Sequence, residues 1–217
     1  MKMQSSFLAA AAVFVLGHAS LNAAIIFTES LGTIATTTAI ATHETANGFD
    51  NDLLAFSGTG ELRNTSASSG YGGASGSANI FLTDDVSSNL KIAGISSVGY
   101  TVGSIGVSFG AFKNTTASDM TTLILEYSAD GSTWTSIGIP AQPTGSGTAT
   151  WRSVSIANTG IPAVASLSLR WTNTDAIAQF RLDDITLSGT PTPVPEPAAA
   201  TLLGALGALA LLCRRRA

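Results

Sequence analysis

Leu123 to Ile137 reads LILEYSADGSTWTSI, and this stretch predicts a β-hairpin. In its first half, Leu123, Leu125 and Tyr127 alternate with Ile124, Glu126 and Ser128, the period-two pattern of a strand with one buried face. The segment from residue 129 to residue 132, ADGS, has the composition of a tight turn, and the residues after it return as a second strand. The hairpin therefore predicts an antiparallel sheet that packs one face against a core.

The same alternation recurs further along the chain. Leu167, Leu169 and Trp171 share one parity, whereas Ser168 and Arg170 fall on a solvated face. No window of comparable length shows sustained helical periodicity. Further strands are expected at residues 25 to 29, 79 to 83, 99 to 103, 106 to 112, 151 to 157 and 179 to 187. Many short strands joined by Gly, Ser, Asn and Asp predict an all-β fold, an antiparallel two-sheet jelly-roll sandwich.

Composition excludes several classes of protein. The chain has 217 residues and a single Cys, which excludes both a disulfide scaffold and a Cys-rich zinc site. Residues 25 to 189 contain thirteen acidic and six basic side chains, so this part carries a net charge of −7. Such a charge makes nucleic acid an unsuitable partner, whereas the excess carboxylates could hold Ca²⁺.

The N-terminus predicts export. Lys2 is followed by an apolar run from Phe7 to Leu16 and by small residues that end at Ala24. A basic start, a short apolar region and a small-residue cleavage site are typical of a secretory signal peptide. We therefore expect residues 1 to 24 to be removed by signal peptidase after engagement of the export machinery, which leaves residues 25 to 189 as the mature domain.

The C-terminus has three parts in a fixed order. Residues 190 to 197 are rich in proline and predict an extended linker. Residues 198 to 213 are apolar, a little shorter than the about 18 to 20 residues of a full membrane span. Arg214, Arg215 and Arg216 then predict a cytoplasmic end by the positive-inside rule. Residues 198 to 217 are thus expected to form a transmembrane helix with a basic tail.

This end resembles the PEP-CTERM sorting signal of Gram-negative bacteria, on the motif Val194-Pro195-Glu196-Pro197, the apolar helix and the arginine cluster. The resemblance implies that a membrane-embedded exosortase cleaves the chain, with Pro195, Glu196 and Pro197 as its processing site. It also implies a transient anchor in the inner membrane, followed by transfer to the cell surface or the extracellular matrix. A plain tail anchor with a proline-rich neck is the alternative.

Two short stretches resemble signature strands of secreted bacterial jelly-roll domains that bind carbohydrate or mediate surface adhesion. They are YSADGSTW, residues 127 to 134, and LDDI, residues 182 to 185. The resemblance implies a structural Ca²⁺ held by Glu29 near the first strand and Asp183 in the last. Solvated strand-end carboxylates are the alternative. The apolar residues also change parity within the last strand, which predicts a β-bulge at Asp183 and Asp184.

Catalytic chemistry finds little support in the sequence. After removal of the signal peptide His43 is the only histidine, and we expect it in a solvated loop because it has no convergent partners. No nucleophile elbow, phosphate loop or zinc spacing occurs. A glycosidase needs only two carboxylates, and Asp50, Asp84 and Glu126 could supply them. Spacing along the chain does not show that any two converge.

Three tryptophans could stack on sugars. Trp171 shares a face with two leucines and is expected in the core, whereas Trp151 is the better surface candidate for glycan binding and Trp134 has no such assignment. The main hypothesis is an exported, non-catalytic cell-surface or matrix protein delivered by its sorting tail. The alternative is a carbohydrate-binding module acting on extracellular polysaccharide, and a glycan-cleaving enzyme comes third.

Overall fold

The computed structural model describes residues 22 to 193 and four isolated positions in the tail, residues 204, 207, 211 and 214. Almost all of the expected signal peptide, the motif Pro195 to Pro197 and most of the expected membrane helix lie outside the described residues. In the part of the chain that is described, no helix is both long enough and apolar enough to span a membrane.

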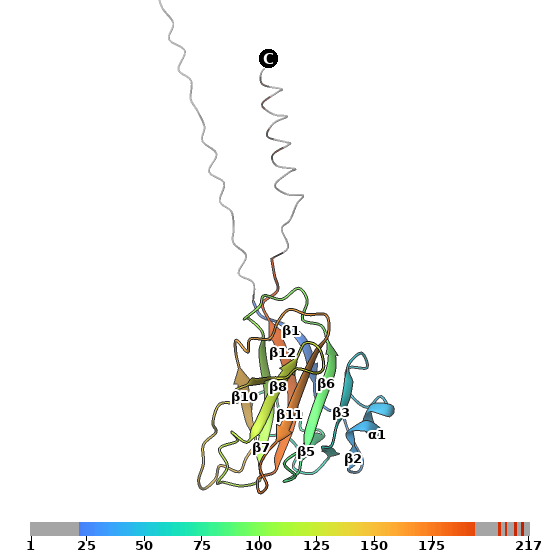
Figure 1. Cartoon of the computed structure of the whole chain (residues 1–217), viewed down its shortest axis with the longest axis vertical. Helices are drawn as coiled ribbons and strands as arrows, with labels where there is room; N and C mark the ends of the chain where they lie inside the picture. Colours follow the sequence, from blue (N-terminus) through green and yellow to red (C-terminus); the bar gives the residue numbers. More distant parts are fainter. Residues whose placement is uncertain (1–21, 194–203, 205–206, 208–210, 212–213, 215–217) are drawn as a thin grey trace, which may run out of the picture.

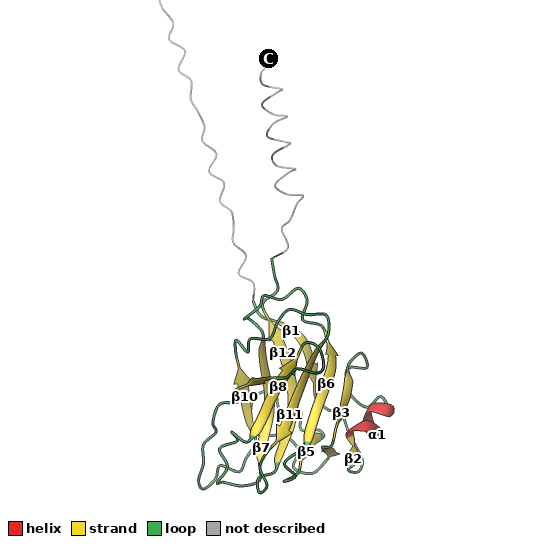
Figure 2. Cartoon of the chain, viewed as in Figure 1, coloured by secondary structure: helices red, strands yellow, loops and turns green. Residues whose placement is uncertain are grey.

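The strands form two antiparallel sheets that pack face to face (Figure 2). The seven-stranded sheet consists of β1 (Ala24–Glu29), β2 (Thr38–Ala39), β4 (Glu61–Arg63), β5 (Asn79–Leu82), β7 (Gly106–Lys113), β10 (Arg152–Ile156) and β12 (Phe180–Gly189). The five-stranded sheet consists of β3 (Ala55–Gly58), β6 (Asn89–Ile95), β8 (Leu123–Ser128), β9 (Thr135–Ile137) and β11 (Leu167–Asn173). One short helix, α1 (Ile40–Thr45), lies between β2 and β3 (Figure 1). The prediction of an all-β, two-sheet antiparallel sandwich is confirmed.

Successive strands alternate between the sheets, as in a jelly roll. The order within the seven-stranded sheet is β10-β7-β12-β5-β4-β2, with β1 also beside β12, and the order within the other sheet is β3-β6-β11-β8-β9. The chain therefore crosses to the opposite sheet at each step from β5 to β8 and again from β9 to β12. This crossing places sequence-distant strands side by side, so each face of the sandwich combines residues from several parts of the chain.

One expected strand is absent. Residues 99 to 103 form a loop, because Gly99 and Gly103 adopt positive φ angles of 87° and 83° that an extended strand does not accommodate. Within this loop only Tyr100 makes an isolated β-bridge, to Pro191. The strands β2, β3, β4 and β6 and the helix α1 were not expected from the sequence.

Trp171 lies at the centre of the core between the sheets. Its side chain is fully buried and meets the ring of Phe109, from the opposite sheet, edge to face at a centroid distance of 5.6 Å. Leu169 and Leu125, neighbours on the same inner face, are also fully buried. The expectation of a core position for Trp171 is confirmed.

The bulge expected in β12 is present. The register of β12 against β7 shifts between Asp183 and Thr186, and Asp184 has a φ of 50°. As a result Leu182 and Ile185, which have opposite parity, are both fully buried. Along one edge β12 pairs first with β5 and, beyond the bulge, with β1.

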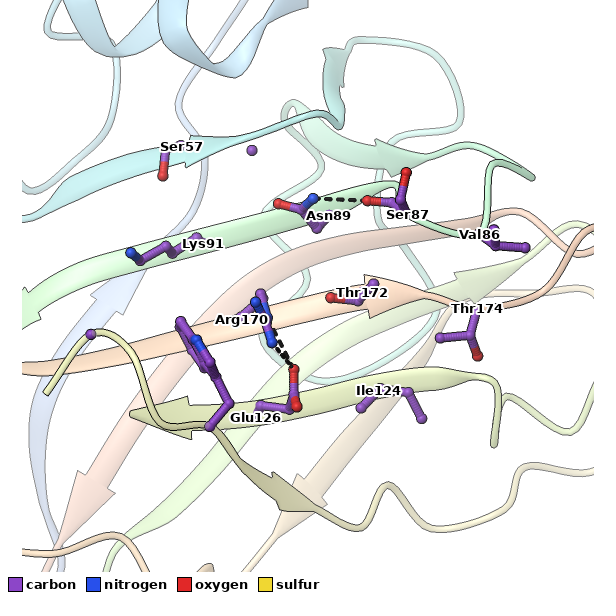
Figure 3. Close-up of a pocket in the computed structure, with 13 residues that line it drawn as sticks. Ser57, Val86, Ser87, Asn89, Lys91, Ile124, Glu126, Arg170, Thr172 and Thr174 are labelled. Atoms are coloured by element: carbon purple, nitrogen blue, oxygen red, sulfur yellow. Dashed lines mark hydrogen bonds and ion pairs between the residues drawn. The ribbon is translucent and has the colours of Figure 1, made fainter. Parts of the chain in front are cut away.

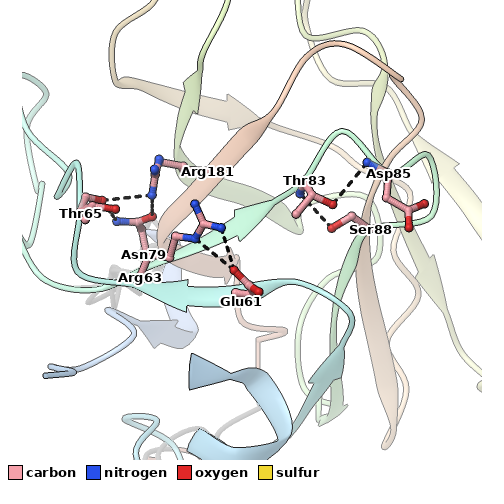
Figure 4. A network of polar contacts seen from close by, with 8 residues as sticks. All are labelled: Glu61, Arg63, Thr65, Asn79, Thr83, Asp85, Ser88 and Arg181. Carbon is pink, nitrogen blue, oxygen red and sulfur yellow. Dashed lines mark hydrogen bonds and ion pairs between the residues drawn. The ribbon is translucent and has the colours of Figure 1, made fainter. Parts of the chain in front are cut away.

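Two arginines of the seven-stranded sheet make contacts that stabilise the fold. The guanidinium carbons of Arg63 and Arg181 lie 3.6 and 4.8 Å from the ring centroid of Phe81. Arg181 also donates a hydrogen bond of 2.8 Å to the side-chain oxygen of Asn79, and Arg63 is paired with Glu61 (Figure 4). These contacts hold β4, β5 and β12 together, with Arg63 paired to a carboxylate and Arg181 bonded to neutral oxygens.

Candidate ligand-binding face and buried carboxylates

An open hollow of about 730 Å³ lies on the outer face of the five-stranded sheet (Figure 3). Outward-facing side chains of β3, β6, β8 and β11 line it, together with the turn between β8 and β9. A volume of this size is within the range of small-molecule sites. In this hollow a ligand could make contacts with several strands at once.

The composition of the hollow follows from strand alternation. Lys91, Glu126 and Arg170 point outward into it, while neighbours in the chain such as Leu90 and Leu125 are fully buried on the inner face. Every second residue of these strands is apolar and forms the core. Most of the intervening residues are polar and line the hollow, as expected for β8 and β11, but the apolar Ile124 also faces it and Ser168 is buried.

A row of charged residues crosses the sheet at one end of the hollow. Arg170 on β11 lies opposite Lys91 on β6 and Glu126 on β8. Its Nε and Nη2 donate hydrogen bonds of 2.9 and 2.6 Å to Oε2 of Glu126 (Figure 3). The partly exposed indole of Trp134 lies over this row, 4.0 Å from Cζ of Arg170 and 5.6 Å from Nζ of Lys91, measured to the ring centroid. The cation–π contact fixes an aromatic ring at the edge of the hollow.

The other end of the hollow is uncharged and combines polar and apolar side chains. Thr172 and Thr174 present hydroxyl groups next to the apolar side chains of Ile124 and Val86, and Asn89 presents an amide that donates to the carbonyl of Ser87 at 2.8 Å (Figure 3). Ser57, opposite Lys91, adds a hydroxyl group at the charged end. Hydroxyls and amides both donate and accept hydrogen bonds. This end can therefore match a ligand that carries hydroxyl groups.

The expectation that Trp151 lies exposed on the surface is wrong. Trp151 is only 8% exposed, its indole N–H donates a 2.9 Å hydrogen bond to the carbonyl of Ser66, and its ring lies between Tyr71 and Phe112. The loop that carries Ser66 and Tyr71 covers it. Trp134 receives no role from the sequence, although its parity indicates an outward position. It has the same parity as Ser136, which pairs with Glu126 on the outer face.

The carboxylates considered for glycan cleavage do not share a site. Glu126 is paired with Arg170, and it is the only carboxylate among the described residues that line the hollow. Asp50 binds Ser30 near the end of β1, and Asp84 lies exposed in the turn after β5. His43, expected in a solvated loop, is instead buried on α1. The paired-carboxylate arrangement of a glycosidase is not formed by these residues.

Glu29, one of the two expected calcium ligands, is fully buried at the end of β1. Its carboxylate accepts hydrogen bonds from the backbone N–H of Leu31 at 2.7 Å and from that of Asp50 at 3.0 and 3.1 Å. Burial raises the pKa of Glu29 to about 7 despite these hydrogen bonds, which lower it. A solvated strand-end position is therefore wrong for this residue.

Asp183 is also fully buried, at the bulge of β12. Its oxygens accept hydrogen bonds from the hydroxyl of Ser75 at 3.1 Å and from the backbone N–H of Asp184 at 2.8 Å. Burial raises the pKa of Asp183 to about 6, and the neighbouring charge of Asp184 adds to the rise. Among the described residues, neither Asp183 nor Glu29 forms a salt bridge.

Glu29 and Asp183 lie near one another through strand pairing. Glu29 is opposite Ile185 of β12, and a chain of hydroxyl hydrogen bonds runs from Asp183 through Ser75 and Ser77 to the carbonyl of Ser30. Carboxylate, hydroxyl and carbonyl oxygens are the ligand types that Ca²⁺ prefers. Over residues 22 to 193, however, no group of three or more His, Cys, Asp or Glu side chains is close enough to hold a metal ion. Calcium binding stays a prediction.

Comparison with known proteins gives only remote likenesses. No family model matches the chain, and no curated protein matches it. Among solved structures, TmCBM61 in complex with β-1,4-galactotriose is 18% identical over 62% of this chain and 86% of its own, with a TM-score of 0.36. The CBM22-1 xylan-binding domain of Paenibacillus barcinonensis Xyn10C is 14% identical over 81% of this chain and all of its own, with a TM-score of 0.40.

The first prediction concerns calcium. We expect millimolar Ca²⁺ to raise the melting temperature of the exported protein by several degrees relative to EGTA, since saturation at one hundred times Kd stabilises by about 2.7 kcal/mol. Asp183→Asn should remove most of this shift, because it deletes a charged oxygen ligand at nearly constant volume. Asp84→Asn, in an exposed turn, should leave the shift intact. Superimposable melting curves in Ca²⁺ and EGTA would contradict the prediction.

The second prediction concerns pH in the absence of calcium. The folded protein binds protons at Glu29 and Asp183 more tightly than the unfolded chain, whose pKa values are 4.5 and 3.8. Their stabilising contribution is therefore complete below about pH 4, falls as the pH rises to about 7, and stays constant above it. Melting temperatures measured in EGTA should decrease across this window, and Glu29→Gln should flatten the upper part of the decrease. A melting temperature that rises from pH 4.5 to 7 would contradict the prediction.

Proposed function

We propose that residues 25 to 189 form a non-catalytic carbohydrate-binding module whose ligand lies in the hollow of the five-stranded sheet. The observation that carries the proposal is the indole of Trp134, held by Arg170 at the edge of a polar hollow. A sugar ring has apolar C–H faces and a rim of hydroxyl groups. An aromatic ring beside hydrogen-bonding side chains complements both parts of that surface.

The remaining lining fits the same ligand. Asn89, Thr172 and Ser57 supply amide and hydroxyl groups from three different strands, so hydrogen bonds can reach a ligand from several directions. The hollow is open along the sheet rather than enclosed. An internal segment of a polysaccharide chain could therefore enter it without a free chain end. The geometry alone supports this function, since the similarities to solved structures are remote.

We further propose that the protein is exported and delivered to the cell surface or the extracellular matrix by its PEP-CTERM-like tail. The position of the chain ends supports this route. Ala24 pairs with Gly189, and Pro191 forms a bridge with Tyr100, so both ends of the domain leave from the same end of the sandwich (Figure 1). A tether at that end leaves the hollow, on a side face, open to extracellular polysaccharide.

Trp134→Ala tests the binding site. We expect this variant to lose at least about tenfold in affinity for the polysaccharide that the exported protein binds, because aromatic anchors dominate such interfaces. Trp134→Phe should keep most of the affinity, since it retains an aromatic face. Affinity gel electrophoresis after a glycan array gives the measurement, and melting curves check that each variant is folded. Unchanged binding by Trp134→Ala would remove the hollow as the site.

Intact-mass measurement tests the delivery route. In a host with an exosortase, we expect a mature form that lacks the segment after Pro197, because the motif before it is the expected processing site. Replacement of Pro195, Glu196 and Pro197 by alanine should leave the segment attached. An unprocessed tail on the unaltered protein in such a host would contradict the sorting role, and it would leave the carbohydrate-binding proposal untouched.

A further inference from the structure

We infer that the glycan in the hollow is acidic, a polysaccharide containing hexuronate residues whose carboxylate contacts Lys91. The inference rests on the proposed carbohydrate-binding function and names the class of its ligand. Three observations support it: an uncompensated cation, the distribution of charge over the domain, and the position of Lys91 relative to Trp134.

Lys91 carries a charge that no described carboxylate neutralises; Lys113, Arg152 and Arg181 also lack a salt bridge, but of these four only Lys91 lines the hollow. Glu126 neutralises Arg170 through two hydrogen bonds to one oxygen, whereas Lys91 forms no salt bridge among the described residues. Lys91 points outward from the middle of β6 into the hollow, so the core does not require it. A site for a neutral sugar would need only hydroxyl and amide groups at this position. The unpaired ammonium therefore indicates an anionic group on the ligand.

The charge of the hollow is opposite to that of the domain. Residues 25 to 189 hold thirteen acidic and six basic side chains, yet the hollow is lined by two of the bases and only one of the acids. Other bases are committed elsewhere: Lys113 is fully buried and donates to the carbonyl of Pro143 at 2.6 Å, and Arg181 is bound to Asn79. The net negative domain repels a polyanion over most of its surface. The hollow is a local exception that would orient such a chain.

The geometry allows one sugar residue to meet both groups. Nζ of Lys91 lies 5.6 Å from the centroid of the Trp134 ring. In a hexuronate the carboxylate is attached at the edge of the sugar ring, next to the ring oxygen. Arg170, with its partner Glu126, occupies one face of the indole, so a sugar ring stacks on the other face and can direct its carboxylate past the ring edge towards Lys91. Asn89 and Thr172 would bind the hydroxyl groups of the next residue along the strands.

The test uses matched polymers and the exported protein. Polygalacturonate, alginate and hyaluronan are each compared with their carboxyl-reduced forms, in which the carboxylate is replaced by a neutral hydroxymethyl group. We expect at least one acidic form to bind about two- to fivefold more tightly than its reduced form at low salt, the range of a partly exposed ion pair. Raising the salt concentration should diminish the ratio.

Two variants test whether the preference for the acidic form depends on Lys91, and one further polymer tests whether it depends on the sugar ring. Lys91→Gln should bring the ratio of acidic to reduced affinity close to one, whereas Arg63→Gln, which removes the same charge on the other sheet, should leave the ratio unchanged. Single-stranded DNA, a polyanion without hexose rings, should bind more weakly than the acidic glycan. Equal binding of acidic and reduced forms, or equal loss in both variants, would overturn the inference while the carbohydrate-binding function stands. Absence of binding to every polymer, acidic or reduced, would count against the function itself.

Discussion

The change of face within β12 is the constraint on which the rest of the structure depends. This strand pairs with β7 along its length and exchanges one neighbour, β5, for another, β1, on its other edge. In a regular strand, residues an odd number of positions apart point to opposite faces of the sheet. Without the bulge, Ile185 would therefore point to solvent if Leu182 pointed into the core. The bulge at Asp183 and Asp184 returns both halves of the strand to the same core. It also places two carboxylates at the point where the sheet changes neighbours.

One of these carboxylates, that of Asp184, holds a loop over one face of the sandwich. Asp184 accepts hydrogen bonds from the hydroxyl of Tyr71 and the backbone N–H of Ser75, and so holds the glycine-rich loop on the outer face of the seven-stranded sheet. Gly110 of β7 makes room for it, since a Cβ there would overlap the hydroxyl of Tyr71. The same loop covers Trp151. The loop leaves only a smaller hollow of about 180 Å³ beside Tyr71 on that face, whereas the hollow on the outer face of the five-stranded sheet measures about 730 Å³.

Local pattern predicted the parts of this arrangement that depend only on strand alternation. The hairpin around Asp130, the core position of Trp171 and the bulge in β12 follow from parity, and the structure confirms them. Very short strands such as β2 and β4 are missed because two or three residues show no period. The exposure of Trp151 was misjudged because the loop over it is brought there by Asp184, a contact between residues more than one hundred positions apart. Burial by a loop from a distant part of the chain does not change the local alternation of polar and apolar residues.

The row Lys91, Arg170 and Glu126 shows how the fold determines what the site can do. Two cations directly opposite each other on neighbouring strands repel, so Glu126 on the third strand is needed to keep Arg170 in place. With its charge matched, the guanidinium can support the indole of Trp134 in a geometry that an unpaired, solvated arginine would not hold. The one acid in the hollow is thereby occupied in a structural ion pair rather than available for proton transfer. What remains for a ligand is an aromatic ring, a single ammonium, neutral hydrogen-bonding groups and the apolar side chains of Ile124 and Val86, a set suited to recognition and not to bond cleavage.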